Sequence, residues 1–283
     1  MKRLITLSGL ILVLLVGLQP PVIAEGKYNW DETRLVNDKF NVFLGGQAVD
    51  FRTDVGVGTG VIGTTIQLEN DLDLQDNQST FLLGGFWRFK PKHNLTFSYA
   101  SLGRDGVTTI DEEIEFEDVV FVQGELASTF DVDLLSLAYQ YSFVNNKRTE
   151  AGFSAGLSFY DFNIALQGDI EVTNSAKQIL SEEGAADEGI LAPIPTVGLF
   201  IRHGLRPNLI LCFRANFLNL DVSDYLIRVA STGVSLDWYF SKHVGIGIGS
   251  GTSDIQFEST GGETQYRVAY RQSGFTGYFS FGF

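Results

Sequence analysis

The sequence predicts an all-β fold, in which a single antiparallel, up-and-down transmembrane β-barrel of about ten strands forms one domain. Two patterns predict it. Apolar residues alternate with small or polar residues in many segments of the chain, and successive side chains of a strand point to opposite faces. The segments are each near the roughly 9–11 residues that a tilted strand needs to cross hydrocarbon.

The alternating segments follow one another along the chain, each with one apolar face. The first has Phe40, Val42 and Leu44 on that face. The next nine apolar faces are Phe81, Leu83, Trp87 and Phe89; Leu95, Phe97 and Tyr99; Leu135, Leu137, Tyr139, Tyr141 and Phe143; Phe153, Ala155, Leu157 and Phe159; Val197, Leu199 and Ile201; Leu209, Leu211, Phe213, Ala215 and Phe217; Val234, Leu236, Trp238 and Phe240; Val244, Ile246 and Ile248; and Phe275, Phe279, Phe281 and Phe283. Eight or twelve strands stay open, because 60–68 and 107–122 also alternate. We interpret these two as strand extensions above the membrane.

The first 24 residues are expected to be a cleaved secretory signal peptide. A short basic start precedes an apolar run over residues 4–18, and small residues follow as far as Ala24. The run is shorter than the roughly 20 residues of a membrane-spanning helix. The lone cysteine, Cys212, is far from the cut, which excludes a lipoprotein.

Composition limits the remaining possibilities. The formal net charge of −14 argues against nucleic acid as a partner, since nucleic acid binds clustered Lys and Arg. A single cysteine cannot form an internal disulfide. After the signal peptide no apolar run reaches helical membrane-spanning length. A membrane protein of this kind must therefore be a barrel, because only helices and closed barrels satisfy all backbone groups in lipid.

The last segment, 275–283, resembles the closing strand of Gram-negative outer-membrane β-barrels. Phe279, Phe281 and Phe283 share one face, and the last of them ends the chain. The resemblance implies that these three residues are the signal recognised by the barrel-assembly machinery. It also implies location in the outer membrane of a Gram-negative bacterium, with outer-membrane lipid and lipopolysaccharide as partners.

Short and long connections alternate, and this predicts the topology. Outer-membrane barrels have short periplasmic turns and long extracellular loops. Both termini then lie in the periplasm, residues 25–38 form a periplasmic tail or a partial plug, and 39–283 form the barrel. Short turns are expected near 91–93, 145–147, 206–208 and 241–242, long connections near 53–78, 104–126 and 169–191, and shorter ones near 221–225 and 258–265.

The other faces of the segments predict a polar lumen. They carry charged residues among Gly, Ser, Thr and Asn. We expect ion pairs to plug so narrow a barrel and to give it low conductance. The alternative is a soluble β-sandwich whose wet surface carries these charges, but aromatic residues at the segment ends favour an interfacial girdle. The candidate lumen charges are Arg88, Glu150, Arg202, Arg214 and Asp237.

The long connections are acidic. Acidic loops either bind divalent cations and steer cationic solutes, or simply stay solvated, and we favour the second interpretation. Asp71, Asp73 and Asp76 are spaced like acids of a calcium loop, but the central Gly and terminal Glu of the EF-hand are missing. They are weak metal candidates, and no cofactor is expected.

Catalysis is not expected. Neither a GxSxG elbow nor an HExxH pair occurs in the chain. The three histidines, His93, His203 and His243, fall at the predicted periplasmic turns. General base catalysis at the outer leaflet would need one of them at the other end. A site built from loop carboxylates alone stays open.

Several stretches resemble a widespread family of proteobacterial outer-membrane β-barrel proteins without an assigned reaction. The resemblance covers most of the mature chain and implies architecture, not catalytic residues. The chain is also distantly similar to OmpW-like small barrels, which implies passage of small hydrophobic molecules. The matching stretches are 63–72, 87–89, 93–99, 139–143 and 244–247.

Three functions follow as hypotheses. The favoured one is an envelope structural component or a narrow conduit for small solutes, which could be hydrophobic or cationic. The second is a ligand-binding or adhesin-type surface barrel that uses the acidic loops. The third and least favoured is an outer-leaflet hydrolase that uses loop carboxylates.

Overall fold

The computed structural model describes residues 29–59, 65–111, 114–116, 119–173, 179–261 and 264–283. The predicted signal peptide and part of the first family-like stretch lie outside these ranges. None of the helices in them is long and apolar enough to span a membrane.

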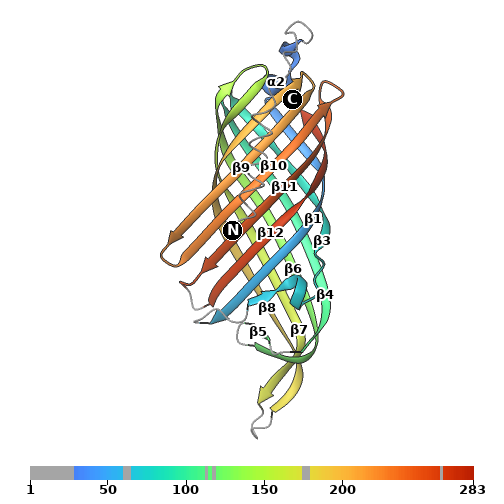
Figure 1. Ribbon diagram of the computed structural model, residues 1–283, viewed down its shortest axis with the longest axis vertical. Coiled ribbons are helices and arrows are strands. Elements are labelled where there is room, and N and C mark those ends of the chain that lie inside the picture. The colour runs from blue at the N-terminus through green and yellow to red at the C-terminus, as the bar shows by residue number, and fades with distance from the viewer. Residues whose placement is uncertain (1–28, 60–64, 112–113, 117–118, 174–178, 262–263) are drawn as a thin grey trace, which may run out of the picture.

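Ten long strands form a closed antiparallel ring, which confirms the predicted fold class (Figure 1). Neighbours along the chain pair with each other, and the last strand pairs with the first. The ring strands are β1 (Phe40–Thr59), β3 (Asn77–Lys90), β4 (His93–Ile110), β6 (Val119–Asn145), β7 (Thr149–Thr173), β8 (Ile179–Arg206), β9 (Leu209–Val222), β10 (Tyr225–Tyr239), β11 (Val244–Ser259) and β12 (Thr264–Gly282).

The remaining elements are short. They belong to the N-terminal segment and to the loops at the far end of the barrel. Strand β2 pairs with β1, and β5 pairs with β6. These elements are η1 (Trp30–Glu32), α2 (Arg34–Asn37), β2 (Thr65–Gln67), α3 (Leu68–Asp71) and β5 (Ile114–Phe116).

The two ends of the barrel differ. The short turns, α2 and the end of β12 lie together at one end, which is uppermost in Figure 1. We call it the turn end. At the opposite end, β4, β5 and β6 cover most of 107–122, which agrees with the predicted strand extension there. The connection near 169–191 differs from expectation, because it is largely strand. Strands β7 and β8 stay paired out to Thr173 and Ile179. Continued alternation contributes to this, since β7 keeps a buried face as far as Leu166 and β8 has one from Ala186 onward.

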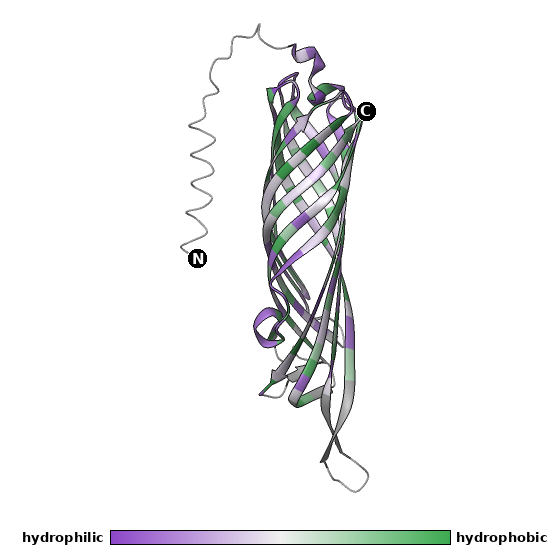
Figure 2. Ribbon diagram, turned by 90° about the vertical axis from the view of Figure 1, so that its right-hand side faces the viewer, coloured by the Kyte–Doolittle hydropathy of each residue, from purple (hydrophilic) through white to green (hydrophobic). Residues whose placement is uncertain are grey.

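The polarity of the ring strands inverts along their length. On β1, Phe40 and Leu44 face outward and are 40% and 42% exposed, whereas Val49, Phe51 and Val55 face inward and are buried. Most of the exposed large apolar residues lie on the half nearer the turn end and form a belt there. Figure 2 shows apolar positions along the strands of this half. Inward apolar residues fill the other half, which we call the outer zone. The belt suits lipid, whereas the outer zone has the core of a water-soluble β-protein.

The outer zone is packed shut. Phe162 of β7 and Tyr270 of β12 lie with ring centroids 5.9 Å apart. These two strands occupy opposite positions in the ring of ten. Their contact therefore spans the whole lumen. Tyr266 of β12 also donates a hydrogen bond to Glu188 of β8, with 2.9 Å between the oxygens.

Candidate functional site

The N-terminal segment lies across the turn end of the lumen. Leu35 of α2 is buried, and it belongs to a small apolar cluster with Ile210 and Tyr239. The guanidinium of Arg88 donates hydrogen bonds to the carbonyl oxygens of Leu35 and Asp38, at 2.8 and 3.2 Å. The described part of this segment therefore covers part of the lumen opening at the turn end, and we call it the plug.

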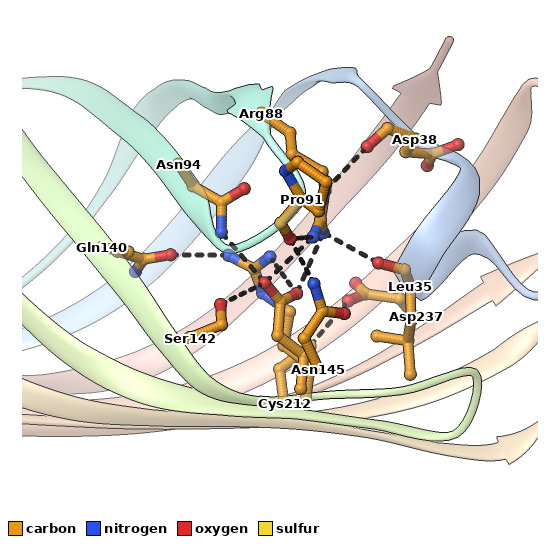
Figure 3. Close-up of polar contacts among 12 residues, drawn as sticks. Leu35, Asp38, Arg88, Pro91, Asn94, Gln140, Ser142, Asn145, Cys212 and Asp237 are labelled. Atoms are coloured by element: carbon orange, nitrogen blue, oxygen red, sulfur yellow. Dashed lines mark hydrogen bonds and ion pairs between the residues drawn. The ribbon is translucent and has the colours of Figure 1, made fainter.

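A buried carboxylate organises the lumen wall next to this plug. Glu150 is fully buried, and Arg88 binds both of its oxygens at 3.1 and 3.0 Å. Arg202 lies 3.1 Å from Oε2. Asn94 and Ser142 donate to Oε1 at 3.0 and 2.7 Å (Figure 3). Such complete pairing offsets the cost of removing the carboxylate from water.

The strand ends explain why these residues meet. Each of these residues lies on the inward face, within a few residues of a short turn. They come from five consecutive strands of the ring. The Arg202 guanidinium also lies over the ring of Phe86, 4.7 Å from its centroid. The members of this cluster, which we call the Glu150 cluster, are Arg88 on β3, Asn94 on β4, Ser142 on β6, Glu150 on β7 and Arg202 on β8.

Asp38 joins the plug to the barrel. Burial raises the pKa of its carboxyl to about 6, against the opposing charges of Arg34, Arg88 and His243. Arg34 lies 3.1 Å from Asp38 Oδ1 and donates to the Gly282 carbonyl at 3.1 Å. The plug is therefore held by β12 as well as by β3.

The two other predicted lumen charges do not pair with each other. Asp237 accepts hydrogen bonds from Tyr278 Oη and, at 3.3 Å, from Cys212 Sγ. Arg214 has neither a hydrogen bond nor an ion pair within the described part of the chain. The expected ion-paired lumen thus holds for Arg88, Glu150 and Arg202 but not for this pair.

A polar chamber of about 300 Å³ occupies the middle of the lumen. It reaches from Gln140, beside the Glu150 cluster, to Tyr160, beside the core of the outer zone. Most of its lining residues are Ser, Thr, Asn or Gln, and Arg214 is the one charged residue among them in the described chain. A smaller cavity of about 90 Å³ extends toward the plug and is lined by Cys212 and Asp237.

A second buried ion pair, which strand parity did not predict, lies in the outer zone. Arg104 lies 2.5 Å from Glu69 Oε1 and donates to Thr53 Oγ1 at 2.8 Å. Its guanidinium lies over the rings of Phe51 and Phe130, about 5 Å from each centroid. Glu69 lies on α3, within the connection near 53–78 that the sequence predicts to be an acidic loop. The inward parity of Arg104 was the available signal.

The three weak metal candidates, Asp71, Asp73 and Asp76, do not come together in one group of ligands. Asp71 Oδ2 accepts from the Gln67 amide at 2.7 Å, and Asp76 offers its carbonyl to the Phe51 amide. Asp73 has a positive φ of 51°. Across the described ranges, His, Cys, Asp and Glu side chains form no group of three or more that could hold a metal ion.

All three histidines lie at the turn end. His93 Nδ1 is 2.5 Å from the Tyr139 hydroxyl. His203 Nδ1 is 2.9 Å from Thr149 Oγ1, and His243 Nδ1 is 2.8 Å from the Gly282 carbonyl oxygen. They contact wall and turn groups.

Comparison with known proteins gives structural likeness only. Neither a protein-family model nor a curated protein matches the chain. The outer-membrane protease OmpT from Escherichia coli is 10% identical, with 88% of this chain and 97% of that chain covered and a TM-score of 0.56. OprG from Pseudomonas aeruginosa is 10% identical, with 88% and 98% covered and a TM-score of 0.37. The P. putida toluene transporter TodX is 9% identical, with 88% and 91% covered and a TM-score of 0.36.

The likeness to OmpT concerns the fold alone, because the identity is so low. With the apolar belt, it defines the class of protein: a β-barrel of the Gram-negative outer-membrane type. The location expected from the sequence, the outer membrane, is the location of this class.

Proposed function

We propose that this barrel is a structural component of the outer membrane whose lumen does not conduct in the folded state. The contact of Phe162 with Tyr270 across the ring carries the proposal. At the turn end the plug and the Glu150 cluster add a second closure. A ten-stranded barrel is also much narrower than the 16–18-stranded porins.

Conductance in planar bilayers tests this proposal. Purified protein is inserted after its fold has been checked by heat-modifiable gel mobility, and a trimeric porin serves as the positive control. We expect insertion without steady open-channel steps, because both ends of the lumen are filled. Large, steady steps from the folded barrel would overturn the proposal.

A narrow conduit is the second candidate function, and the polar chamber supports it. A cavity of about 300 Å³ lined by hydroxyl and amide groups is a site that a polar solute could occupy on its way through the lumen. Passage would require displacement of the plug and rearrangement of the outer zone. Liposome-swelling assays with small sugars distinguish the conduit from a purely structural barrel, which would show no swelling above that of empty vesicles.

The proposal includes neither a reaction nor a loop ligand. Neither the polar chamber nor the smaller cavity is lined by an acid from the outer connections. Deletion of residues 105–125 is not a clean test of the adhesin alternative, because that range contains parts of β4 and β6. We keep Phe279, Phe281 and Phe283 as the proposed assembly signal; all three are exposed on the outside of the wall, at 58%, 37% and 62%.

A further inference from the structure

The lumen and the whole chain have opposite charge. Three arginines, Arg88, Arg202 and Arg214, face two acids, Glu150 and Asp237, between the plug and the outer zone. The excess is one positive charge, in a chain whose formal net charge is −14. A cleft lined by one sign of charge concentrates ions of the other sign. This sign favours an anion, whereas the acidic exterior favours cations.

The excess charge is on Arg214. Arg88 and Arg202 share Glu150 and are satisfied by it. Asp237 is satisfied by a hydroxyl and a thiol instead of a guanidinium. The Arg214 side chain is exposed within the barrel, and it lines both the chamber and the smaller cavity beside it. Asp237 lines the same smaller cavity but forms no ion pair with Arg214. A guanidinium that forms no ion pair in a confined space is an anion-binding group.

The wall leaves room beside Arg214. Its cross-strand partner on β10 is Gly233. A Cβ placed on Gly233 would meet no atom nearer than the Ser250 carbonyl oxygen, at 3.8 Å. The chamber volume of about 300 Å³ is at the lower end of the range for small-ligand pockets.

The rest of the chamber wall has a different chemistry from Arg214. Neutral hydroxyl and amide groups such as Gln47, Ser98, Thr196 and Asn216 come from four separate strands. Neutral donors and acceptors of this kind match the hydroxyl groups of a ligand, while the guanidinium matches a carboxylate through two parallel hydrogen bonds.

We propose that the chamber binds a small hydroxylated monocarboxylate of the sugar-acid type, with its carboxylate on Arg214. The hydroxyl groups of the ligand contact the neutral wall. This inference rests on the chamber that supports the conduit candidate. It concerns binding alone, so a barrel that never conducts can still satisfy it.

Equilibrium dialysis with labelled gluconate tests the inference. The barrel is refolded from denaturant in the presence of the probe, so that closed ends do not keep the probe out. Glucose serves as the neutral analogue, and inorganic phosphate as an anion without carbon-bound hydroxyl groups. We expect one gluconate per barrel, bound at least tenfold more tightly than glucose or phosphate.

Variants assign the binding to the chamber. Arg214→Gln removes the charge and should weaken gluconate binding at least tenfold, whereas Arg214→Lys should weaken it less. Arg52→Gln removes an exposed arginine from the outside of β1 and should leave binding unchanged. Heat-modifiable mobility confirms that each variant is folded.

Three results would overturn the inference. They are no gluconate retained by the folded wild-type barrel, equal affinity for gluconate and glucose, and unchanged affinity in Arg214→Gln. Phosphate bound as tightly as gluconate would refute the hydroxyl contacts. The proposed structural role is tested independently, because open-channel steps in planar bilayers would refute it without affecting the binding inference.

Discussion

At the scale of single residues, Glu150 holds the closed turn end together. It is fully buried and binds two guanidinium groups, an amide and a hydroxyl. Removing the charge leaves Arg88, which is buried, and Arg202, which is partly buried, without their ion-pair partner. Uncompensated buried charge is among the most destabilising changes that one substitution can make.

Glu150→Gln is therefore expected to lower the free energy of unfolding by about 3–5 kcal/mol. Urea unfolding of the barrel in lipid vesicles measures the change. The matched control is Glu125→Gln, an exposed acid of the outer zone, which should change stability by less than about 0.5 kcal/mol. Equal midpoints for the two variants would show that the Glu150 cluster does not stabilise the fold.

At the scale of elements, each long strand has one part that is exposed to lipid and another part that is exposed to water. The outward face of β1 is apolar at Val42 and Leu44 but charged at Asp50 and Arg52. Lipid surrounds the first part, and water surrounds the second. The apolar side chains therefore lie on the outer face in the first part and on the inner face in the second. The segment from Phe40 to Asp50 is as long as the roughly 9–11 residues that a transmembrane strand needs.

Substitutions along β1 should reveal this boundary. Leu44→Arg puts a charge near the middle of the belt and should cost about 2–4 kcal/mol of unfolding free energy. Asp50→Arg lies at the edge and should cost about 0–1 kcal/mol. Both are measured by urea unfolding in vesicles. Similar costs at the two positions would mean that the belt does not end where the polarity inverts.

At the scale of the whole molecule, the lumen has two independent closures. The N-terminal segment closes the turn end, and contacts between opposite walls close the outer zone. Cys212 reports on the first closure, because it lines the cavity between the plug and the chamber. It is the one cysteine of the chain, so its labelling is specific.

Deletion of residues 29–38 should expose Cys212 without opening a channel. We expect a water-soluble methanethiosulfonate to label it at least tenfold faster than in the full barrel, while planar bilayers still show no steady steps. Labelling in denaturant gives the total thiol as a control. An unchanged labelling rate would show that the segment is not a plug, and steady steps would show that the outer zone does not close the lumen.

Much of the fold could be predicted from local pattern. Alternation with period two indicated the strands, and short turns against long connections indicated the topology. The extent of the strands could be predicted only in part. Alternation indicated the strand extension at 107–122, where β4 ends at Ile110 and β6 begins at Val119, but the region near 169–191, most of which belongs to β7 and β8, is predicted to be a connection.

The candidate site, like the fold, could be predicted only in part. Strand parity by itself determined that Arg88, Glu150 and Arg202 face the lumen, since a side chain's face depends only on its position along a strand. Only the tertiary structure decided that these three charges form one cluster, that Arg214 forms no ion pair, and that opposite walls meet in the outer zone. The physical reason is that such contacts depend on the register of non-adjacent strands and on the curvature of the closed wall, and neither is present in any single segment.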